Sequence, residues 1–282
     1  IAEMNLALLL GAAGLSAELF GHRLFPIGTL YDPFVARALD AIHYGCYMNS
    51  RFMLVGTPSG ISLAPEGGAH QSIGTPLMGM STPNLLTYEP AFADEVKACM
   101  HHGFQHMQLP ADAGGGSIYL RLSTRSLEQP DRNLMQDSAT RERIIKGGYW
   151  HVPPGPNTDT VVVFAGVVAK EAIQAQAERG ANTALLQVSS YDLLFAEWKN
   201  KGDASYVAEL LAPVPRDAKL VTVMDGHPAT LSWLGGVGGH KVCLSSWVRL
   251  SLCGQMVPLG VQDFGQAGDT VDLYEKYGIN TD

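Results

Sequence analysis

The residues best suited to chemistry lie in one short glycine-rich stretch, Pro65-Glu66-Gly67-Gly68-Ala69-His70-Gln71-Ser72. It places a carboxylate and an imidazole four residues apart, separated by residues small enough to let the backbone approach a ligand closely. Histidine titrates near neutral pH, so His70 suits proton transfer, and Glu66 could orient a substrate. The residues alone leave open whether Glu66 and His70 form a site or are ordinary surface polar residues.

The neighbouring segments indicate what positions this pair. Residues 51–56 form an apolar run typical of a buried strand, and open α/β sheets bind ligands at loops that follow such strands. Glycine-rich chain is seldom helical, so we expect Glu66 and His70 on an exposed loop. Residues 24–31 predict another strand, after which Asp32 is expected to cap a helix that has Pro33 in its first position.

Strands and helices alternate over the rest of the chain. Further strands are expected at 84–88, 117–123, 160–166, 184–188, 220–224 and 257–261, and helices at 89–107, 169–179, 191–199, 206–211 and 270–277. Residues 126–157 are polar and lack periodicity, which is typical of a linker. We therefore predict an α/β fold of two consecutive domains, 1–125 and 158–282, each a mostly parallel sheet covered by helices and joined by the linker 126–157.

Composition excludes several classes of protein. Hydrophobic residues make up 46% of the 282 residues, which supplies an ample core, and the net charge of −8 argues against nucleic-acid binding. Cys46, Cys99, Cys243 and Cys253 are scattered without Cys-x-x-Cys spacing, so we expect buried free thiols in a reducing compartment. The apolar run 6–15 is too short to cross a bilayer and follows no basic segment, so we expect a soluble, cytoplasmic protein.

Three other motifs were weighed as sites. His102 and His106 have the i, i+4 spacing of a metal-binding pair, but no third ligand accompanies them, and we expect them on a solvated helix face. Residues 235–239 are rich in glycine but lack the spacing of a nucleotide-binding loop. They and Asp225-Gly226-His227 are interpreted as turns.

The stretch from Glu66 to Gln71 resembles the ligand loop of the thiamine-diphosphate-dependent transketolase superfamily, in the form found in the homodimeric pyruvate dehydrogenase decarboxylating component. The opening Ile1-Ala2-Glu3-Met4 resembles the Gly-Ile-x-Glu segment of the pyrimidine-binding domain. Tyr31 and Phe34 keep the spacing of the aromatic residues that hold the aminopyrimidine ring. The residues alone also allow Glu3 to be a helix-start carboxylate and the aromatic pair to be core.

The resemblance implies that the enzyme decarboxylates a 2-oxo acid, namely pyruvate, and passes the acyl group to a lipoyl acceptor. It implies that Glu3 hydrogen-bonds ring nitrogen N1′ of thiamine diphosphate, that His70 faces the reactive carbon and that Glu66 lies beside it. Thr124-Arg125 resembles the Ser-Arg pair with which transketolases bind the acidic end of a substrate, so Arg125 either meets a carboxylate or phosphate or forms a surface salt bridge. Transketolases carry a substrate-binding histidine near the position of Pro58. This histidine is missing here, which argues against ketol transfer.

The family's Gly-Asp-Gly and Asn motif, which holds the diphosphate and Mg²⁺, does not occur in the sequence. We expect this motif in a preceding domain that is absent from this chain. The chain would then be part of a longer or split protein and would be inactive alone. The resemblance further implies a homodimer and a lipoyl acyltransferase partner. Two alternatives remain open: a transketolase-like ketol transferase, favoured by Arg125, and a non-catalytic scaffold or dimerisation fragment.

Overall fold

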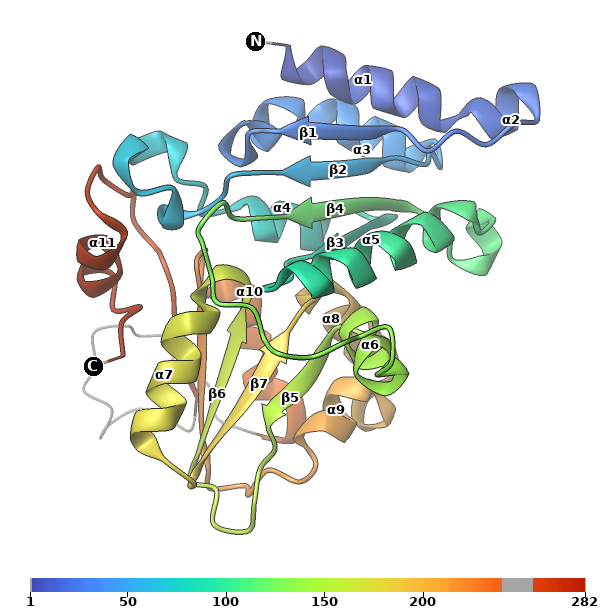
Figure 1. Ribbon diagram of the computed structural model, residues 1–282. Coiled ribbons are helices and arrows are strands. Elements are labelled where there is room, and N and C mark those ends of the chain that lie inside the picture. The colour runs from blue at the N-terminus through green and yellow to red at the C-terminus, as the bar shows by residue number, and fades with distance from the viewer. Residues whose placement is uncertain (1, 240–255, 282) are drawn as a thin grey trace.

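The computed structural model describes residues 2–239 and 256–281, and these form two β-sheets, one above the other in Figure 1. The first sheet has four strands in the order β1-β2-β4-β3, and every neighbouring pair is parallel. The second has five strands in the order β5-β7-β6-β8-β9, and only the β5–β7 pair is antiparallel. The expected α/β fold with two mostly parallel sheets is confirmed.

The first sheet is built from the amino-terminal half of the chain. In chain order its elements are α1 (Glu3–Gly14), α2 (Ser16–Phe20), β1 (Ile27–Leu30), the 3₁₀ helix η1 (Asp32–Ala38), α3 (Leu39–Tyr47), β2 (Met53–Gly56), the 3₁₀ helices η2 (Ile61–Glu66) and η3 (Gly68–His70), α4 (Thr75–Ser81), β3 (Leu85–Tyr88), α5 (Ala93–Gln108), η4 (Ala111–Ala113) and β4 (Ser117–Arg121). Because the strands are parallel, the chain returns through a helical crossover after each of the first three.

The second sheet follows. Its elements are α6 (Ser138–Ile145), β5 (Gly148–Val152), β6 (Thr160–Ala165), η5 (Gly166–Val168), α7 (Ala169–Arg179), β7 (Thr183–Val188), α8 (Tyr191–Lys201), η6 (Gly202–Ala204), α9 (Tyr206–Leu211), β8 (Lys219–Met224), α10 (Ala229–Ser232), η7 (Trp233–Gly239), β9 (Met256–Leu259) and α11 (Thr270–Lys276). The segment 126–157, expected to be a linker, thus contains α6 and also β5, which pairs with β7 inside the second sheet.

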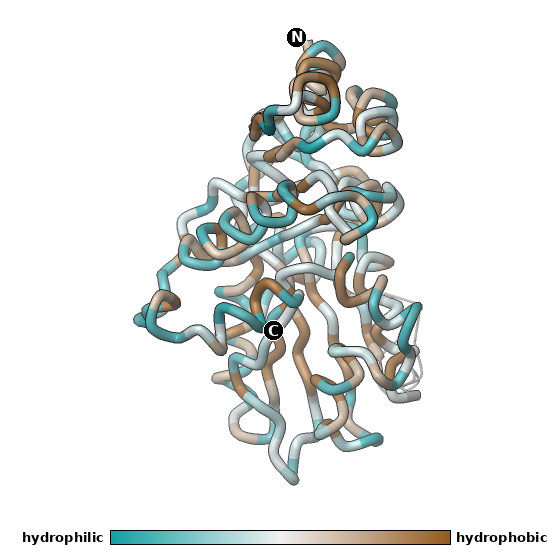
Figure 2. The backbone as a smooth tube through the Cα atoms, turned by 90° about the vertical axis from the view of Figure 1, so that its right-hand side faces the viewer, coloured by the Kyte–Doolittle hydropathy of each residue, from teal (hydrophilic) through white to brown (hydrophobic). Residues whose placement is uncertain are grey.

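Alternation along β6 shows how the second sheet is covered on both faces. Val161, Val163 and Ala165 pack into a core with residues of α8, α9 and α10. Val162 and Phe164 point the other way and pack with residues of α7 and α11. All six β6 residues are buried, which explains the uninterrupted apolar run in the sequence, visible as hydrophobic strands in Figure 2.

The start of the helix after β1 differs from the expectation. Asp32 does not cap a helix through its side chain, and the segment begins as the 3₁₀ helix η1, with α3 following from Leu39. Pro33 does lie in the first helical turn, as expected. The Asp32 carboxylate is instead fully buried among side chains of other elements, described below.

Candidate active site

Four of the residues singled out in the sequence meet beyond the carboxyl ends of β1 and β2. Tyr31 and Phe34 follow β1, and Glu66 and His70 come from the two short 3₁₀ helices after β2. The Tyr31 hydroxyl donates a hydrogen bond of 2.6 Å to Glu66 Oε2. The His70 ring lies 6.0 Å from the Tyr31 ring and 5.6 Å from the Phe34 ring, measured between centroids. Parallel strands place their carboxyl ends on one edge, which is why segments 35 residues apart converge.

Tyr31 is the donor that fixes the carboxylate. Its pKa is raised because the ring is partly buried and because the charge of Glu66 disfavours a phenolate beside it. The phenol therefore keeps its proton throughout the physiological range and holds the Glu66 carboxylate in one orientation. Glu66 and His70 themselves remain exposed on this loop, as the sequence predicted, although the loop is wound into short 3₁₀ turns.

Glu3 lies at the first position of α1, next to this cluster. Its side chain is buried, and its Oε1 has no hydrogen-bond partner among the described residues. The nearest cation is Arg37, whose Nη1 lies 3.6 Å from that oxygen and whose guanidinium covers the Phe34 ring at 3.8 Å. A buried carboxylate oxygen without a partner costs free energy unless a ligand supplies a donor.

A buried carboxylate, Asp32, joins the two segments that carry the cluster. Directly after Tyr31 in the chain, it accepts hydrogen bonds from the hydroxyls of Ser72, Thr75 and Tyr119, the bond from Thr75 being 2.7 Å long. Ser72 lies two residues after His70. The Asp32–Ser72 bond therefore holds the aromatic segment and the His70 segment in fixed register.

Arg121, at the end of β4, is the only buried cation in contact with Asp32 among the described residues. It pairs with Glu89 at 2.5 Å and donates to the backbone carbonyls of Ser72 and Asp225 at 3.1 and 2.8 Å. Because Glu89 follows β3 and Asp225 follows β8, this side chain ties together strand ends of both sheets.

Asp225 anchors the loop from the second sheet. Its carboxylate accepts hydrogen bonds from the backbone N–H groups of Ile61 and Ser62, at 2.7 and 2.9 Å, at the start of η2. Gly60 has a φ of +69°, and a Cβ there would collide with the Asp225 carboxylate, so glycine is required on both counts. The sequence pattern predicted Asp225 in a turn and Asp32 as a helix cap, and it did not single out Glu89 or Arg121. Charged residues at the ends of buried strands were the signal available.

Arg125 lies outside this cluster. Its guanidinium makes a two-pronged ion pair with the Glu171 carboxylate, with distances of 2.9 and 2.6 Å, on the far side of the β4 terminus. Of the two possibilities left open by the sequence, the structure shows a salt bridge, formed with α7 of the second sheet.

His102 and His106 do not lie on the solvated helix face that the sequence predicted. Both rings are half-buried and line a cavity, while neighbouring His101 is exposed. Among the described residues no group of three histidine, cysteine, aspartate or glutamate side chains could hold a metal ion.

Cys46 and Cys99 are buried free thiols, as expected, and Cys243 and Cys253 lie outside the described residues. No described helix is long and apolar enough to cross a membrane.

Comparison with known proteins finds relatives of this chain. No family model matches the chain. A pyruvate dehydrogenase E1 component from Mycolicibacterium smegmatis is 26% identical over 282 residues, covering 96% of this chain and 29% of that protein. A probable transketolase from Schizosaccharomyces pombe is 23% identical over 260 residues, covering 92% of this chain and 32% of that protein. The chain thus spans about three-tenths of the length of these relatives.

Solved structures agree on the fold. Transketolase from Leishmania mexicana superposes with a TM-score of 0.70 at 18% identity, covering 99% of this chain and 35% of that one. A structure titled split gene transketolase, inactive β4 tetramer, has a TM-score of 0.66 at 20% identity and covers 100% of this chain and 78% of that one. The fold is that of the transketolases. The predicted resemblance is confirmed, and the chain fits the thiamine-diphosphate-dependent transketolase superfamily, which includes the pyruvate dehydrogenase E1 components.

Proposed function

We propose that this chain supplies the pyrimidine-binding half of a thiamine diphosphate site in an enzyme that decarboxylates a 2-oxo acid, most simply pyruvate, and passes the acyl group to a lipoyl acceptor. The observation that carries the proposal is the buried Glu3 Oε1, which lacks a hydrogen-bond partner and lies beside the cluster of Tyr31, Phe34, Glu66 and His70. Family membership supports the cofactor, and the residues present fit it.

In this proposal Glu3 accepts a hydrogen bond from the protonated N1′ of the aminopyrimidine, which satisfies its unpaired oxygen. Tyr31 and Phe34, with rings 5.0 Å apart at 87°, offer aromatic surface to that ring. When bound, the cofactor supplies the electron sink that makes loss of carbon dioxide feasible. Arg37 lies over Phe34, and its Nη1 lies 3.6 Å from Glu3 Oε1.

His70 and Glu66 act on the substrate side. His70 is exposed on the loop and is free to give a proton to, or take one from, a substrate oxygen. Glu66 keeps one carboxylate oxygen on the Tyr31 hydroxyl, so its other oxygen can orient the substrate. The hydrogen bonds that Ser72 and Ile61 donate to Asp32 and Asp225 hold this loop in place, so Glu66 and His70 are pre-organised at the strand ends.

The choice between two reactions rests on two residues. Transketolases would use an arginine at the position of Arg125 for the acidic end of a sugar phosphate, but Arg125 is already paired with Glu171 through both of its terminal nitrogens. Pro58 stands near the position where transketolases carry a substrate-binding histidine. Both features support pyruvate over ketol transfer, although relatives of both kinds match the chain.

The other half of the site belongs to a partner domain in this proposal. No described residues form a metal-binding group, so we assign the diphosphate and Mg²⁺ to a separate domain, supplied by a longer protein or another chain. We further propose a homodimer and a lipoyl acyltransferase as partners.

The experiment measures carbon dioxide release from pyruvate and ketol transfer from a sugar phosphate, using the intact protein with thiamine diphosphate and Mg²⁺. Replacing Glu3→Gln should lower carbon dioxide release at least about 100-fold, because a glutamine cannot stabilise the protonated ring. Glu18→Gln, at an exposed glutamate in the next helix, α2, is the control and should leave turnover unchanged.

Each outcome decides between the hypotheses. Ketol transfer without decarboxylation would assign the chain to the transketolase branch. Full activity in the Glu3→Gln protein would remove Glu3 from the mechanism. An absence of both activities, with Glu3, Glu66 and His70 substitutions all leaving partner binding intact, would favour the non-catalytic scaffold.

A further inference from the structure

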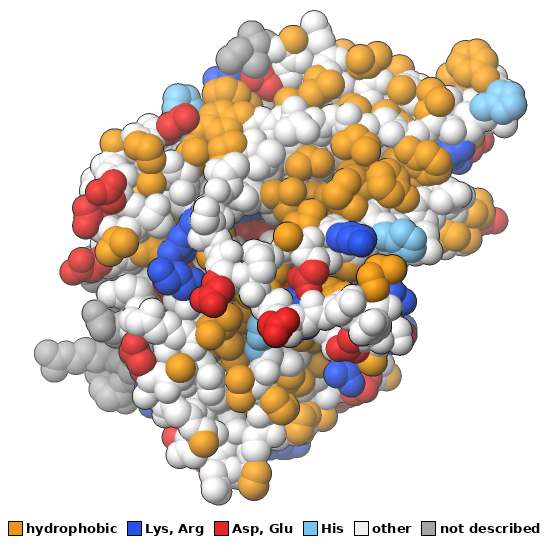
Figure 3. All heavy atoms as spheres, in the orientation of Figure 1, with side chains coloured by type: hydrophobic (Ala, Val, Ile, Leu, Met, Phe, Trp, Pro, Cys, Tyr) orange, Lys and Arg blue, Asp and Glu red, His pale blue; other side chains and the backbone are white. Residues whose placement is uncertain are grey.

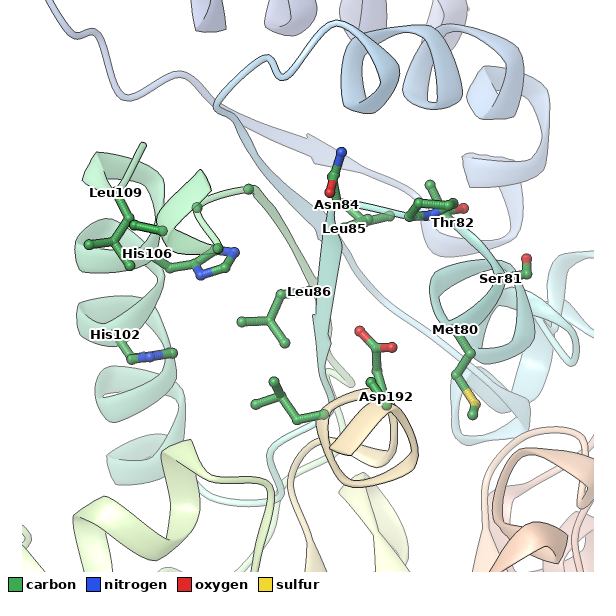
Figure 4. Close-up of a pocket in the computed structure, with 17 residues that line it drawn as sticks. Met80, Ser81, Thr82, Asn84, Leu85, Leu86, His102, His106, Leu109 and Asp192 are labelled. Atoms are coloured by element: carbon green, nitrogen blue, oxygen red, sulfur yellow. The ribbon is translucent and has the colours of Figure 1, made fainter. Parts of the chain in front are cut away.

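The cavity lined by His102 and His106 lies at the opposite end of the first sheet from the candidate active site. It has a volume of about 660 Å³, within the range of small-molecule sites. Its walls come from the start of β3, the glycines before β4, the end of α4, and facing sides of α5 and α8 (Figure 4). Tyr31 and Glu66 lie past the carboxyl ends of the strands, so this cavity shares no residue with the site described above.

His102 presents a hydrogen-bond acceptor to this cavity. The Tyr88 hydroxyl has one proton and donates it to the Ile145 carbonyl at 2.7 Å, so the contact of 2.9 Å between Tyr88 and His102 Nδ1 must be donated by the imidazole. Burial and the neighbouring His101 lower the pKa of His102, so the ring is neutral at pH 7. A neutral ring that is protonated on Nδ1 leaves Nε2 as a bare acceptor.

Asp192 presents a second acceptor, and Figure 4 shows its carboxyl group on the α4 side of β3, across that strand from His102. One oxygen, Oδ2, accepts a bond of 3.1 Å from the backbone N–H of Thr87, and none of the described ion pairs involves this carboxylate. Burial away from any cation raises its pKa to about 7. The remaining oxygen, Oδ1, is available to a ligand.

The rest of the lining is apolar or uncharged. Met80, Leu86, Leu109 and Leu193 supply hydrocarbon surface, and no lysine or arginine lines the cavity. His106, also on α5, has a pKa lowered to about 4 by burial, by His102 and by Arg51, so it adds no positive charge at pH 7. The site therefore offers acceptors without a cation, inside apolar walls.

We propose that this cavity binds a small organic cation, with an ammonium or amidinium group against Asp192 Oδ1 and a short apolar body against the leucines. A cation would supply the opposite charge that the buried Asp192 carboxylate lacks, and its N–H groups would satisfy the remaining carboxylate oxygen. The chain's net charge of −8 also favours the approach of a cation over an anion. This assignment is independent of the proposed function.

Benzamidine is the probe and neutral benzamide its control, with binding to the intact protein followed by calorimetry. Benzamidine should bind at least about tenfold more tightly than benzamide at pH 8, because only the amidinium can pair with the carboxylate. Asp192→Asn should remove this preference while keeping an oxygen for the Thr87 N–H group. Equal affinity for the two probes, or an unchanged preference in the variant, would overturn the proposal.

A substitution at the exposed edge of the cavity tests the proposed cation site without changing the Asp192 carboxyl group. Ala196 is exposed and lines the cavity one helical turn after Asp192. Ala196→Lys should place an ammonium group within reach of Asp192 and lower benzamidine affinity at least about tenfold, whereas Ala196→Gln, of similar length, should not. Similar affinities in these two variants would contradict the assignment.

Affinity should also depend on pH. The titratable groups around Asp192 are the Tyr88 phenol and the imidazoles of His102 and His106, and all three are uncharged at pH 7. The helix α4, which also lines the cavity, contains no titratable side chain. The cation binds the ionised carboxylate, so benzamidine affinity should fall about tenfold per pH unit below 7 and level off above it. A flat profile from pH 5 to 8 would argue against Asp192 as the anchor.

Discussion

The Arg125 side chain is held by an ion pair within the chain. Both terminal nitrogens of the Arg125 guanidinium donate hydrogen bonds to the Glu171 carboxylate. The guanidinium carbon, Cζ, lies 4.9 Å from the centroid of the Tyr274 ring. Only 16% of its side chain and 15% of that of Glu171 are exposed, so the pair is largely withdrawn from water. A guanidinium held in this way fastens β4 to α7 and is not available to a substrate anion.

We therefore predict that Arg125→Gln lowers the free energy of unfolding by about 1 kcal/mol, as for a half-buried two-pronged ion pair, and leaves the KM for pyruvate unchanged. Urea unfolding and steady-state kinetics measure the two effects. Glu171→Gln is the matched control and should give the same loss of stability. A KM that rises in the arginine variant alone would show that Arg125 binds substrate after all.

At the scale of elements, one buried group of charges joins the two sheets. Arg121 at the end of β4 faces Asp32 after β1, Glu89 after β3 and the Asp225 segment after β8. Burial raises the pKa of Glu89 to about 7, against the opposing charge of Arg121 and with the help of Asp225 and Asp32. Three carboxyl groups around one cation cannot all ionise cheaply, so Glu89 keeps its proton at pH values where an exposed glutamate has lost it.

This shift predicts how stability changes with pH. Between about pH 4.5 and 7 the unfolded chain has released the Glu89 proton while the folded protein retains it, so rising pH favours unfolding by up to about 3 kcal/mol over this window. Glu89→Gln should remove that decline, as seen by urea unfolding at pH 5, 6 and 7. Glu178→Gln, on the exposed side of α7, should keep it. Parallel pH curves for the Glu89 variant and the unmodified protein would refute the assignment.

At the scale of the whole molecule, apolar surface is concentrated at one end. Of the fifteen large hydrophobic side chains exposed in the described residues, ten lie between Leu8 and Met48, and Leu9 is 65% exposed and Tyr47 82% exposed. Figure 3 shows hydrophobic side chains gathered over the upper half, which contains the first sheet and α1. Exposed apolar surface of this kind marks an interface, and the second copy of the proposed homodimer is the occupant we assign to it.

We predict that Leu9→Lys raises the dissociation constant of the homodimer at least about tenfold, because a leucine buried in an interface contributes roughly 1.5 to 3 kcal/mol. Sedimentation velocity over a range of concentrations measures this. Ile173→Lys, on α7 of the other half and 39% exposed, should leave association unchanged. Equal dissociation constants for the Leu9 variant and the unmodified protein would exclude α1 from the interface.

Local sequence patterns predict most of the helices and strands and the spacing of the residues suited to chemistry. Strand and helix periodicity depend on neighbours a few residues apart, so α7 and α9 were predicted to the residue and the strands to within a few residues. The spacing of Glu66 and His70, and of Tyr31 and Phe34, is equally local. These are features that short-range sequence can encode.

The contacts that hold those residues in place join segments far apart in the chain. Asp32, Glu89, Arg121 and Asp225 are separated by up to 193 residues, and their contacts follow from strand order and from the packing of one sheet against the other. The linker predicted at 126–157 contains a strand of the second sheet because a short antiparallel edge strand carries little pattern of its own. The burial of His102 likewise depends on α8 lying opposite α5, which no spacing along either helix reveals.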